Sequence, residues 1–221
     1  MKTTIFSGPL SLFGAKVQIA ALEKGIVFEL VMVPFDRDDN YVPKHPEVLR
    51  VNPKGQVPVL IDDEVELFDS TQIFEYLEDR YPSPALWPES PAARAQARQL
   101  ELKADEVFFI PHVYRLFGLQ NDMQSPAALA ACAACARFYD EMETRLATRE
   151  YLAGPYSFAD IAFFMACIFA DRKGAGMTDA TPRLIDWRNR MRDRPAVRTV
   201  VGPMMDFLAS QGRGVPAFLQ R

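Results

Sequence analysis

The sequence predicts two domains of different class, an α/β domain over residues 1–81 and an all-helical domain over residues 91–221. Three observations lead to this prediction. Strand-like and helix-like patterns alternate over the first eighty residues, three prolines fall within residues 81–88, and no strand pattern follows them. Closely spaced prolines make a stiff, extended segment, so residues 82–90 are expected to form a linker.

The elements of the first domain follow from hydrophobic periodicity and from the residues that interrupt it. Gly25 ends a helix-like run, and the tight Asp62-Asp63 connection between two apolar runs is typical of a β-hairpin. Asp69 or Ser70 should cap the last helix, because short polar side chains accept the free N–H groups of a first turn. In chain order we expect a strand over 2–6, a helix over 12–24, a strand over 28–33, a short helix over 43–51, strands over 57–61 and 64–68, and a helix over 69–80. The predicted order is βαβ, then α, then ββα.

The second domain shows helical patterns only. Ser157 and Asp160 form a capping box before an almost wholly apolar run, as expected of a helix whose first N–H groups cannot reach water. Pro111 is expected to kink the first helix, and Pro195 suits the first turn of the last one. The expected helices cover residues 91–118, 127–149, 161–170, 182–192 and 195–209.

Composition excludes several classes of protein. Hydrophobic residues make up 49% and charged residues 24% of the 221 residues, as in globular proteins. The net charge of -4 argues against nucleic acid as a partner, since phosphate neutralisation needs a surplus of Lys and Arg. No apolar run is long enough to span a membrane, and the N-terminus lacks a signal-peptide core. Three cysteines do not suit a secreted disulfide framework, so a cytoplasmic protein with reduced thiols is expected.

Two short motifs have the chemistry to hold an extended ligand. A cis bond at Val57-Pro58 would leave the backbone N–H and C=O of Val57 free for pairing, although an ordinary turn before an edge strand explains the motif equally well. Ser70 at a helix N-terminus can hold a carboxylate, and the neighbouring Asp69 can hold an ammonium group. The alternative for that pair is a plain N-cap.

The succession of these features resembles the cytosolic glutathione transferase superfamily over essentially the whole chain. It comprises the βαβ unit, the GQVPVL loop, the hairpin, the DS helix start, the proline-rich linker and the helical second domain. The segment WRNRMRDRPAV at 187–197 and the Ser157–Asp160 cap also match the family. The resemblance implies a thioredoxin-like domain that binds glutathione as co-substrate, a helical domain that holds a small apolar electrophile, and a homodimer.

The resemblance also implies how glutathione is activated. In this family a tyrosine or serine near the first strand–helix junction donates a hydrogen bond to the glutathione thiolate, whereas members with cysteine there form mixed disulfides. The first tyrosine here is Tyr41 and the first cysteine is Cys132, which leaves serine. Ser11 matches the serine of the S-x-x-x-[RK]-[RK]-V pattern of the phi, tau and related bacterial classes, although those classes often have Thr or Ser at the position of Gly14 and Arg at the position of Ala15. Ser11 can cap the first helix with its oxygen and keep its proton for a sulfur anion.

The remaining contacts are carried over from the family residue by residue. Val57 matches the residue that pairs with the cysteinyl part of glutathione and Pro58 the cis-proline, while Asp69 and Ser70 match the γ-glutamyl site. Lys44 matches a lysine that reaches the glycine carboxylate, and Gln56 matches the neighbouring glutamine. Ser7 is the alternative donor but is expected to be structural, and His45 is expected at the surface. Phe13, Phe35, Tyr114 and Phe117 are candidates for the electrophile pocket.

Two other patterns have simpler explanations. Cys132 and Cys135 lie within a predicted helix, where small residues at this spacing favour close packing over redox chemistry. The arginine-rich residues 183–198 are interleaved with acidic residues and are expected to form a solvated face. His45 and His112 are too few for a metal site.

The primary hypothesis is a glutathione transferase. The alternatives are a glutathione-dependent disulfide reductase or isomerase, and a non-enzymatic binding or interaction protein of this fold.

Overall fold

A computed structural model of the chain describes residues 3–36, 38, 40–63 and 65–220. It contains two compact units, one made of Met1–Ala85 and Pro195–Gly214 and the other of Leu86–Arg194 and Val215–Arg221. The first unit therefore combines the N-terminal region with a segment near the C-terminus. This division differs from the expected domains, in which residues 91–221 form one helical domain.

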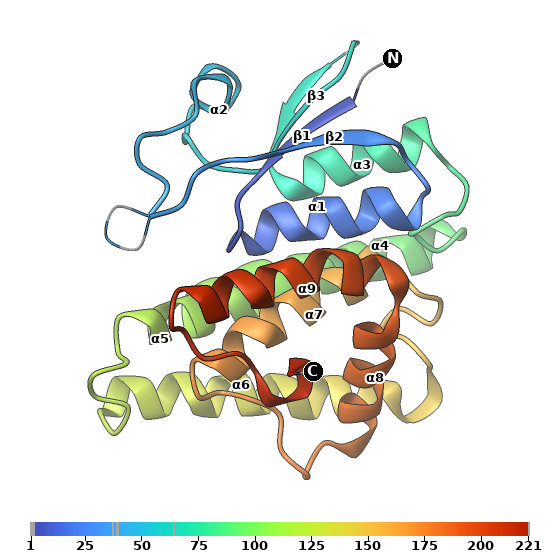
Figure 1. Ribbon diagram of the computed structural model, residues 1–221. Helices are drawn as coiled ribbons and strands as arrows, with labels where there is room; N and C mark the ends of the chain where they lie inside the picture. The colour runs from blue at the N-terminus through green and yellow to red at the C-terminus, as the bar shows by residue number, and fades with distance from the viewer. Residues whose placement is uncertain (1–2, 37, 39, 64, 221) are drawn as a thin grey trace. The chain divides into compact units, whose positions relative to one another are not determined.

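The first unit contains a mixed four-stranded sheet of order β2-β1-β3-β4 (Figure 1). Its strands are β1 (Thr3–Ser7), β2 (Phe28–Met32), β3 (Val59–Ile61) and β4 (Glu66–Phe68). β1 pairs in parallel with β2, which requires a crossover, and α1 (Leu12–Glu23) provides it. β3 pairs antiparallel with both β1 and β4, so the predicted hairpin is confirmed. Lys2 and Glu64, at the ends of two predicted strands, lie outside the described residues.

Three further helices belong to this unit. They are α2 (Pro46–Val51), α3 (Ser70–Arg80) and α9 (Pro195–Ser210). α1 packs against both α3 and α9, and in Figure 1 α1 and α3 run side by side along one face of the sheet. Ile5 of β1, Val17 of α1 and Ile73 of α3 are fully buried in the core between these elements. The apolar face of α9 thus completes the cover over α1.

A buried lysine fixes the end of α1. The Lys24 side chain is fully buried, and its ammonium donates to the carbonyls of Tyr81 and Pro84 at 2.7 and 2.9 Å. Glu78 of α3 lies 2.5 Å from the same nitrogen and balances its charge. A buried charge is tolerated only when it is paired and hydrogen-bonded, as this one is. The contacts join the C-terminal ends of α1 and α3 to the start of the proline-rich segment.

Within its described residues, the second unit contains helices joined by turns and loops, and no named strand. Its elements are α4 (Pro91–Leu102), a π-helical segment (Lys103–Tyr114), α5 (Arg115–Phe117), α6 (Pro126–Arg145), a 3-10 turn (Leu146–Thr148), α7 (Phe158–Arg172), α8 (Pro182–Asp193) and a 3-10 turn (Ala217–Leu219). The predicted helix over 91–118 is one run in three parts, and Pro111 lies in its π-helical part. Wider π turns are a known way for a helix to accommodate an irregularity of this kind.

α7 is the buried helix of this unit, and its start confirms the predicted capping box. The N–H and O–H groups of Ser157 both donate to the carboxylate of Asp160, at 3.0 and 2.9 Å. Leu152 N–H and the indole N–H of Trp187 donate to its other oxygen, each at 2.9 Å. Burial nevertheless raises the pKa of Asp160 to about 6, because desolvation of the charge outweighs these four donors.

Candidate functional site

The strand register brings three of the predicted site segments to one end of the sheet. Phe6 of β1 pairs with Val59 of β3, and Val59 pairs with Phe68 of β4, so these three residues form a row across the sheet. Just beyond this row the chain continues after β1 toward Ser11, before β3 through Val57-Pro58, and after β4 to Asp69-Ser70. Residues far apart in the sequence therefore share one edge.

Ser11 is the N-cap of α1. Its Oγ accepts a hydrogen bond from the Gly14 N–H at 3.0 Å, which satisfies one free donor of the first turn and confirms the predicted cap. Among the described residues, nothing accepts the Ser11 hydroxyl proton. The side chain thus holds a donor at the positive end of a helix, where a negative charge is favoured.

Ser7 and Gly14 explain one departure from the family pattern. Ser7 is fully buried, and its Oγ accepts from Gln18 Nε2 at 2.8 Å, so this serine is occupied within the core. A Cβ at Gly14 would lie 2.1 Å from Ser7 Oγ and 3.1 Å from Ser11 Oγ. Glycine is therefore required for the first turn of α1 to pack against both hydroxyls.

The Val57-Pro58 peptide bond is cis, and Pro58 is buried at the entrance to β3. The backbone N–H and C=O of Val57 form no hydrogen bond with any other residue in the described part of the chain. The structure thus offers one unpaired donor and one unpaired acceptor at the sheet edge. That pair can bind an extended peptide-like ligand in the manner of an added strand.

Asp69 and Ser70 begin α3. Asp69 is the N-cap, and its Oδ1 accepts from the N–H groups of Thr71 and Gln72 at 3.0 and 3.3 Å. Its φ of 75° is in the left-handed region, which costs a non-glycine residue on the order of 1–3 kcal/mol. Ser70 is buried, and its hydroxyl has no partner among the described residues. One carboxylate oxygen and one hydroxyl thus remain for a ligand.

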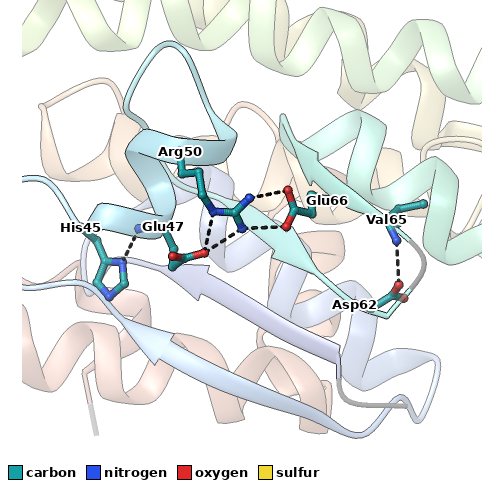
Figure 2. A network of polar contacts seen from close by, with 6 residues as sticks. All are labelled: His45, Glu47, Arg50, Asp62, Val65 and Glu66. Atoms are coloured by element: carbon teal, nitrogen blue, oxygen red, sulfur yellow. Dashed lines mark hydrogen bonds and ion pairs between the residues drawn. The ribbon is translucent and has the colours of Figure 1, made fainter.

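Lys44 and Gln56 lie on either side of α2, and both are exposed. Figure 2 shows how α2 is attached to the sheet: Arg50 donates to Glu47 of the same helix and to both carboxylate oxygens of Glu66 on β4. The guanidinium lowers the pKa of Glu66 through these hydrogen bonds. This attachment fixes the helix between the two residues, but nothing in the structure tests their predicted contacts with glutathione.

His45 caps α2 rather than lying free at the surface. Its Nδ1 accepts from Glu47 N–H at 3.2 Å, as Figure 2 shows, and its ring packs on Phe6 with centroids 5.0 Å apart. The expected surface position is therefore only half right, because the ring is half-buried.

Tyr41 is the residue at this end of the sheet that the sequence did not reveal. Its Oη accepts from Leu10 N–H at 3.1 Å, in the loop between β1 and α1. Its ring lies so close to Gly8 that a Cβ there would fall 2.4 Å from Tyr41 Cε1. Burial raises the pKa of Tyr41 to about 12, so the phenol stays protonated at neutral pH. Tyr41 is therefore a support for the loop that leads to Ser11.

The four candidates for the electrophile pocket divide between the two units. Phe35 packs edge-on against Tyr41, and Phe13 lies 5.5 Å below the Lys16 ammonium. In the second unit the Tyr114 and Phe117 rings have centroids 5.7 Å apart, and Tyr114 is 61% exposed. That these four side chains line the electrophile pocket stays a prediction.

Three further features bear on redox chemistry, metal binding and membrane insertion. Cys132, Cys135 and Cys167 are free thiols, and burial raises the pKa of Cys135 to about 12, which opposes thiolate reactivity. No group of His, Cys, Asp or Glu side chains within the described residues could hold a metal ion. None of the helices that the structure describes is long and apolar enough to cross a membrane.

The chain is similar to proteins of one known family in both of its parts. Residues 5–85 match the family described as glutathione S-transferase, N-terminal domain, and residues 100–195 match glutathione S-transferase, C-terminal domain. Glutathione S-transferase GstB of Escherichia coli K12 is 32% identical over 163 residues, which cover 70% of this chain and 77% of GstB.

The chain is also similar to a protein with a different name and to a solved structure with a bound ligand. A stringent starvation protein A homolog of Coxiella burnetii is 33% identical over 108 residues, and the match spans about half of each chain, 48% in both cases. A glutathione S-transferase structure from Methylobacterium radiotolerans, in complex with glutathione sulfonate, has a TM-score of 0.74 at 25% identity and covers 91% of this chain and 95% of its own.

Proposed function

The chain belongs to the glutathione S-transferase family, and from that premise we propose that it is a glutathione transferase in which Ser11 stabilises the thiolate of bound glutathione. The observation that carries the proposal is the open hydroxyl of Ser11. It caps α1 through its oxygen, keeps its proton, and lies beyond the same end of the sheet as the unpaired groups of Val57 and Ser70.

The reaction requires only a thiol and an electrophile. The glutathione thiol loses its proton to solvent, and the thiolate forms a sulfur–carbon bond with an apolar electrophile while the leaving group departs with its electron pair. A free thiol has a pKa near 8.5, so most of it is protonated at neutral pH. A hydroxyl donor at a helix N-terminus favours the anion and thus increases the reactive fraction.

The rest of glutathione would be held by main-chain and terminal contacts. Val57 would pair with the cysteinyl part, Ser70 and Asp69 with the γ-glutamyl carboxylate and ammonium, and Lys44 and Gln56 with the glycine end. The unpaired backbone of Val57 and the free hydroxyl of Ser70 support the first two assignments. These contacts position the thiol for attack, which accounts for a large share of catalysis in bimolecular reactions.

A chromogenic conjugation assay with 1-chloro-2,4-dinitrobenzene tests the role of Ser11. We expect Ser11→Ala to reduce kcat/KM about 100-fold, the loss typical for one donor to a developing anion. Ser90→Ala is the matched control, because Ser90 caps α4 in the same way, accepting from Ala93 N–H at 3.3 Å. Full activity in Ser11→Ala would show that another group stabilises the thiolate.

The likeness to stringent starvation protein A homologues favours a second candidate, a binding protein that uses this fold without conjugation. Asp69, shorter by one methylene than the glutamate usual in the family, is consistent with a weakened glutathione site. Retention of the wild type on immobilised glutathione supports the first candidate. Passage through the column, together with no conjugating activity, supports the second.

We also propose that the protein forms a homodimer, as its family usually does. The surface of the second unit exposes a row of apolar side chains on α4 and the π-helical segment, namely Leu102, Val107 and Ile110, each more than 40% exposed. Large exposed apolar side chains gathered along one helical run are candidates for an interaction surface. Light scattering should give twice the monomer mass, and Ile110→Glu should shift it toward the monomer.

A further inference from the structure

The short helix α2 lies between two groups of residues that are predicted to contact glutathione. Lys44 precedes α2, and Gln56 and Val57 follow it in one loop. A helix of six residues is too short to be stable without contacts to the rest of the fold, so those contacts determine its orientation. The attachment of α2 to the sheet therefore bears on the glutathione site.

The apolar attachment of α2 is small. The structure describes all of α2, and within it Val48 alone is buried, in a cluster with Phe6 and Val59 of the sheet. The ring of the N-cap residue His45 packs on the same Phe6 side chain, with centroids 5.0 Å apart. An attachment centred on one side chain leaves a short helix able to tilt, unless a second contact holds it.

Arg50 provides that second contact, as Figure 2 shows. Its two terminal nitrogens each donate to a different carboxylate oxygen of Glu66 on β4, both at 2.7 Å. Its Nε and one terminal nitrogen also donate to Glu47 Oε2, at 3.0 and 2.8 Å. Two parallel bonds from a planar guanidinium fix direction as well as distance. Arg50 thus restrains the tilt of α2 against the sheet.

Asn52 connects the position of α2 to the unpaired backbone of Val57. It is the C-cap of α2, is buried, and donates its backbone N–H to the Val48 carbonyl at 2.9 Å. Its Nδ2 donates to the Gln56 carbonyl at 2.6 Å. That carbonyl and the Val57 N–H belong to one trans peptide unit, in which they point in opposite directions. The Asn52 amide therefore determines where the Val57 N–H points.

From these observations we propose that Arg50 is a positioning residue for glutathione, because its attachment to Glu66 holds α2 so that Asn52 presents the Val57 N–H before the ligand arrives. The inference rests on the function proposed above. Without the attachment, glutathione must order α2 as it binds, and this cost weakens its affinity. Ser11 caps α1 and does not depend on α2, so the chemical step should be preserved.

Calorimetric titration with glutathione, in the absence of an electrophile, tests the proposal with two variants of opposite charge change. Arg50→Gln removes a positive charge and Glu66→Gln removes a negative one, but both break the same attachment. Glutathione is an anion at neutral pH, so an effect of charge alone would weaken its binding to the first variant and strengthen its binding to the second.

We expect both variants to raise the Kd of glutathione about threefold to fivefold, the scale of exposed ion pairs in a network. The double variant should bind no more weakly than Arg50→Gln, because the attachment can be lost only once. In the conjugation assay, Arg50→Gln should raise the KM for glutathione by the same factor and leave kcat within about twofold of the wild type.

Arg198→Gln is the matched control, because it removes the same charge from an exposed position on α9, and it should change neither Kd nor KM. An unchanged Kd in Arg50→Gln, tighter binding in Glu66→Gln, or an equal loss in Arg198→Gln would overturn the proposal. A wild type that binds glutathione without conjugating it would contradict only the proposed function, because the comparison of Kd values does not depend on the reaction. A wild type that does not bind glutathione would overturn both.

Discussion

Ser11 and Ser157 are both helix N-caps, each directly before the first residue of its helix, yet the fold uses their hydroxyl protons differently. Ser157 donates its proton to Asp160 at 2.9 Å, and its backbone N–H donates to the same carboxylate. Ser11 accepts from Gly14 N–H at 3.0 Å, and its proton has no acceptor among the described residues. The Ser157 cap is therefore closed, because its hydroxyl proton is bonded within the fold. The Ser11 cap leaves a hydroxyl donor open.

The difference follows from where each helix begins. α7 is buried along almost its whole length, so an unpaired donor at its start would carry the full penalty of desolvation. α1 begins beyond the same end of the sheet as Val57 and Ser70, whose backbone groups and hydroxyl have no hydrogen-bond partner among the described residues, so a ligand can complete the bonding there. A serine N-cap is therefore a candidate for function only when the fold does not use its proton.

Removal of the Asp160 carboxylate, the acceptor in the closed Ser157 cap, should have the largest effect on the free energy of unfolding. Asp160→Ala leaves four buried donors without a partner, including the indole N–H of the fully buried Trp187. We expect a loss of about 4 kcal/mol or more in the free energy of unfolding, measured with urea by circular dichroism. Asp193→Ala, at an exposed position, is the control. A loss below about 1 kcal/mol would contradict the importance of this network.

Substitution of Ser157 should lower mainly the stability of the protein, whereas substitution of Ser11 should lower mainly its activity. Ser157→Ala should lower the free energy of unfolding by about 1–2 kcal/mol and leave kcat/KM within about twofold of the wild type. Ser11→Ala should cost about 1 kcal/mol of stability but reduce kcat/KM about 100-fold. Urea unfolding and the conjugation assay on the same preparations check both. Parallel losses in the two variants would mean that neither hydroxyl acts on the thiol.

The contribution of Asp160 in the closed cap to the stability of the protein should also depend on pH. The folded-state pKa of Asp160, about 6, is above its ordinary value of 3.8, so the native state binds the proton more tightly than the unfolded chain. Its contribution to stability is therefore present at low pH and lost as the pH rises through 6. The difference in unfolding free energy between wild type and Asp160→Asn should be about 1.4 kcal/mol larger at pH 5 than at pH 7.5. An unchanged difference would place the pKa outside this window.

The two serine caps could be predicted from the sequence because their hydrogen bonds join residues that are close together in the chain. The Ser157–Asp160 box spans four residues and was predicted from its spacing, whereas the Ser11 cap, just before a helical pattern, was predicted from the family resemblance and from the capping preference of serine. The hairpin was equally local, since Asp62 and Asp63 join two neighbouring apolar runs. Short-range hydrogen bonds and periodicity determine such features directly.

Contacts between distant segments could not be predicted in this way. Tyr41 is 31 positions from Leu10, and no pattern in the sequence joins them. Gly14 was visible only as a departure from the family, and its cause is the position of Ser7 across the first turn. The packing of α9 against α1 likewise depends on a surface that neither helix encodes alone.

Tyr41→Phe tests the most distant of these contacts and should have the smallest effect. The variant keeps the ring against Gly8 but leaves the Leu10 N–H without its acceptor, so we expect about 1 kcal/mol less stability. Because Leu10 directly precedes Ser11, the loosened loop should reduce kcat/KM about fivefold and shift its pH profile upward as thiolate stabilisation weakens. Tyr151→Phe, in the second unit, is the control and should leave the profile in place. A wild-type pH profile in Tyr41→Phe would show that Ser11 is positioned by α1 alone.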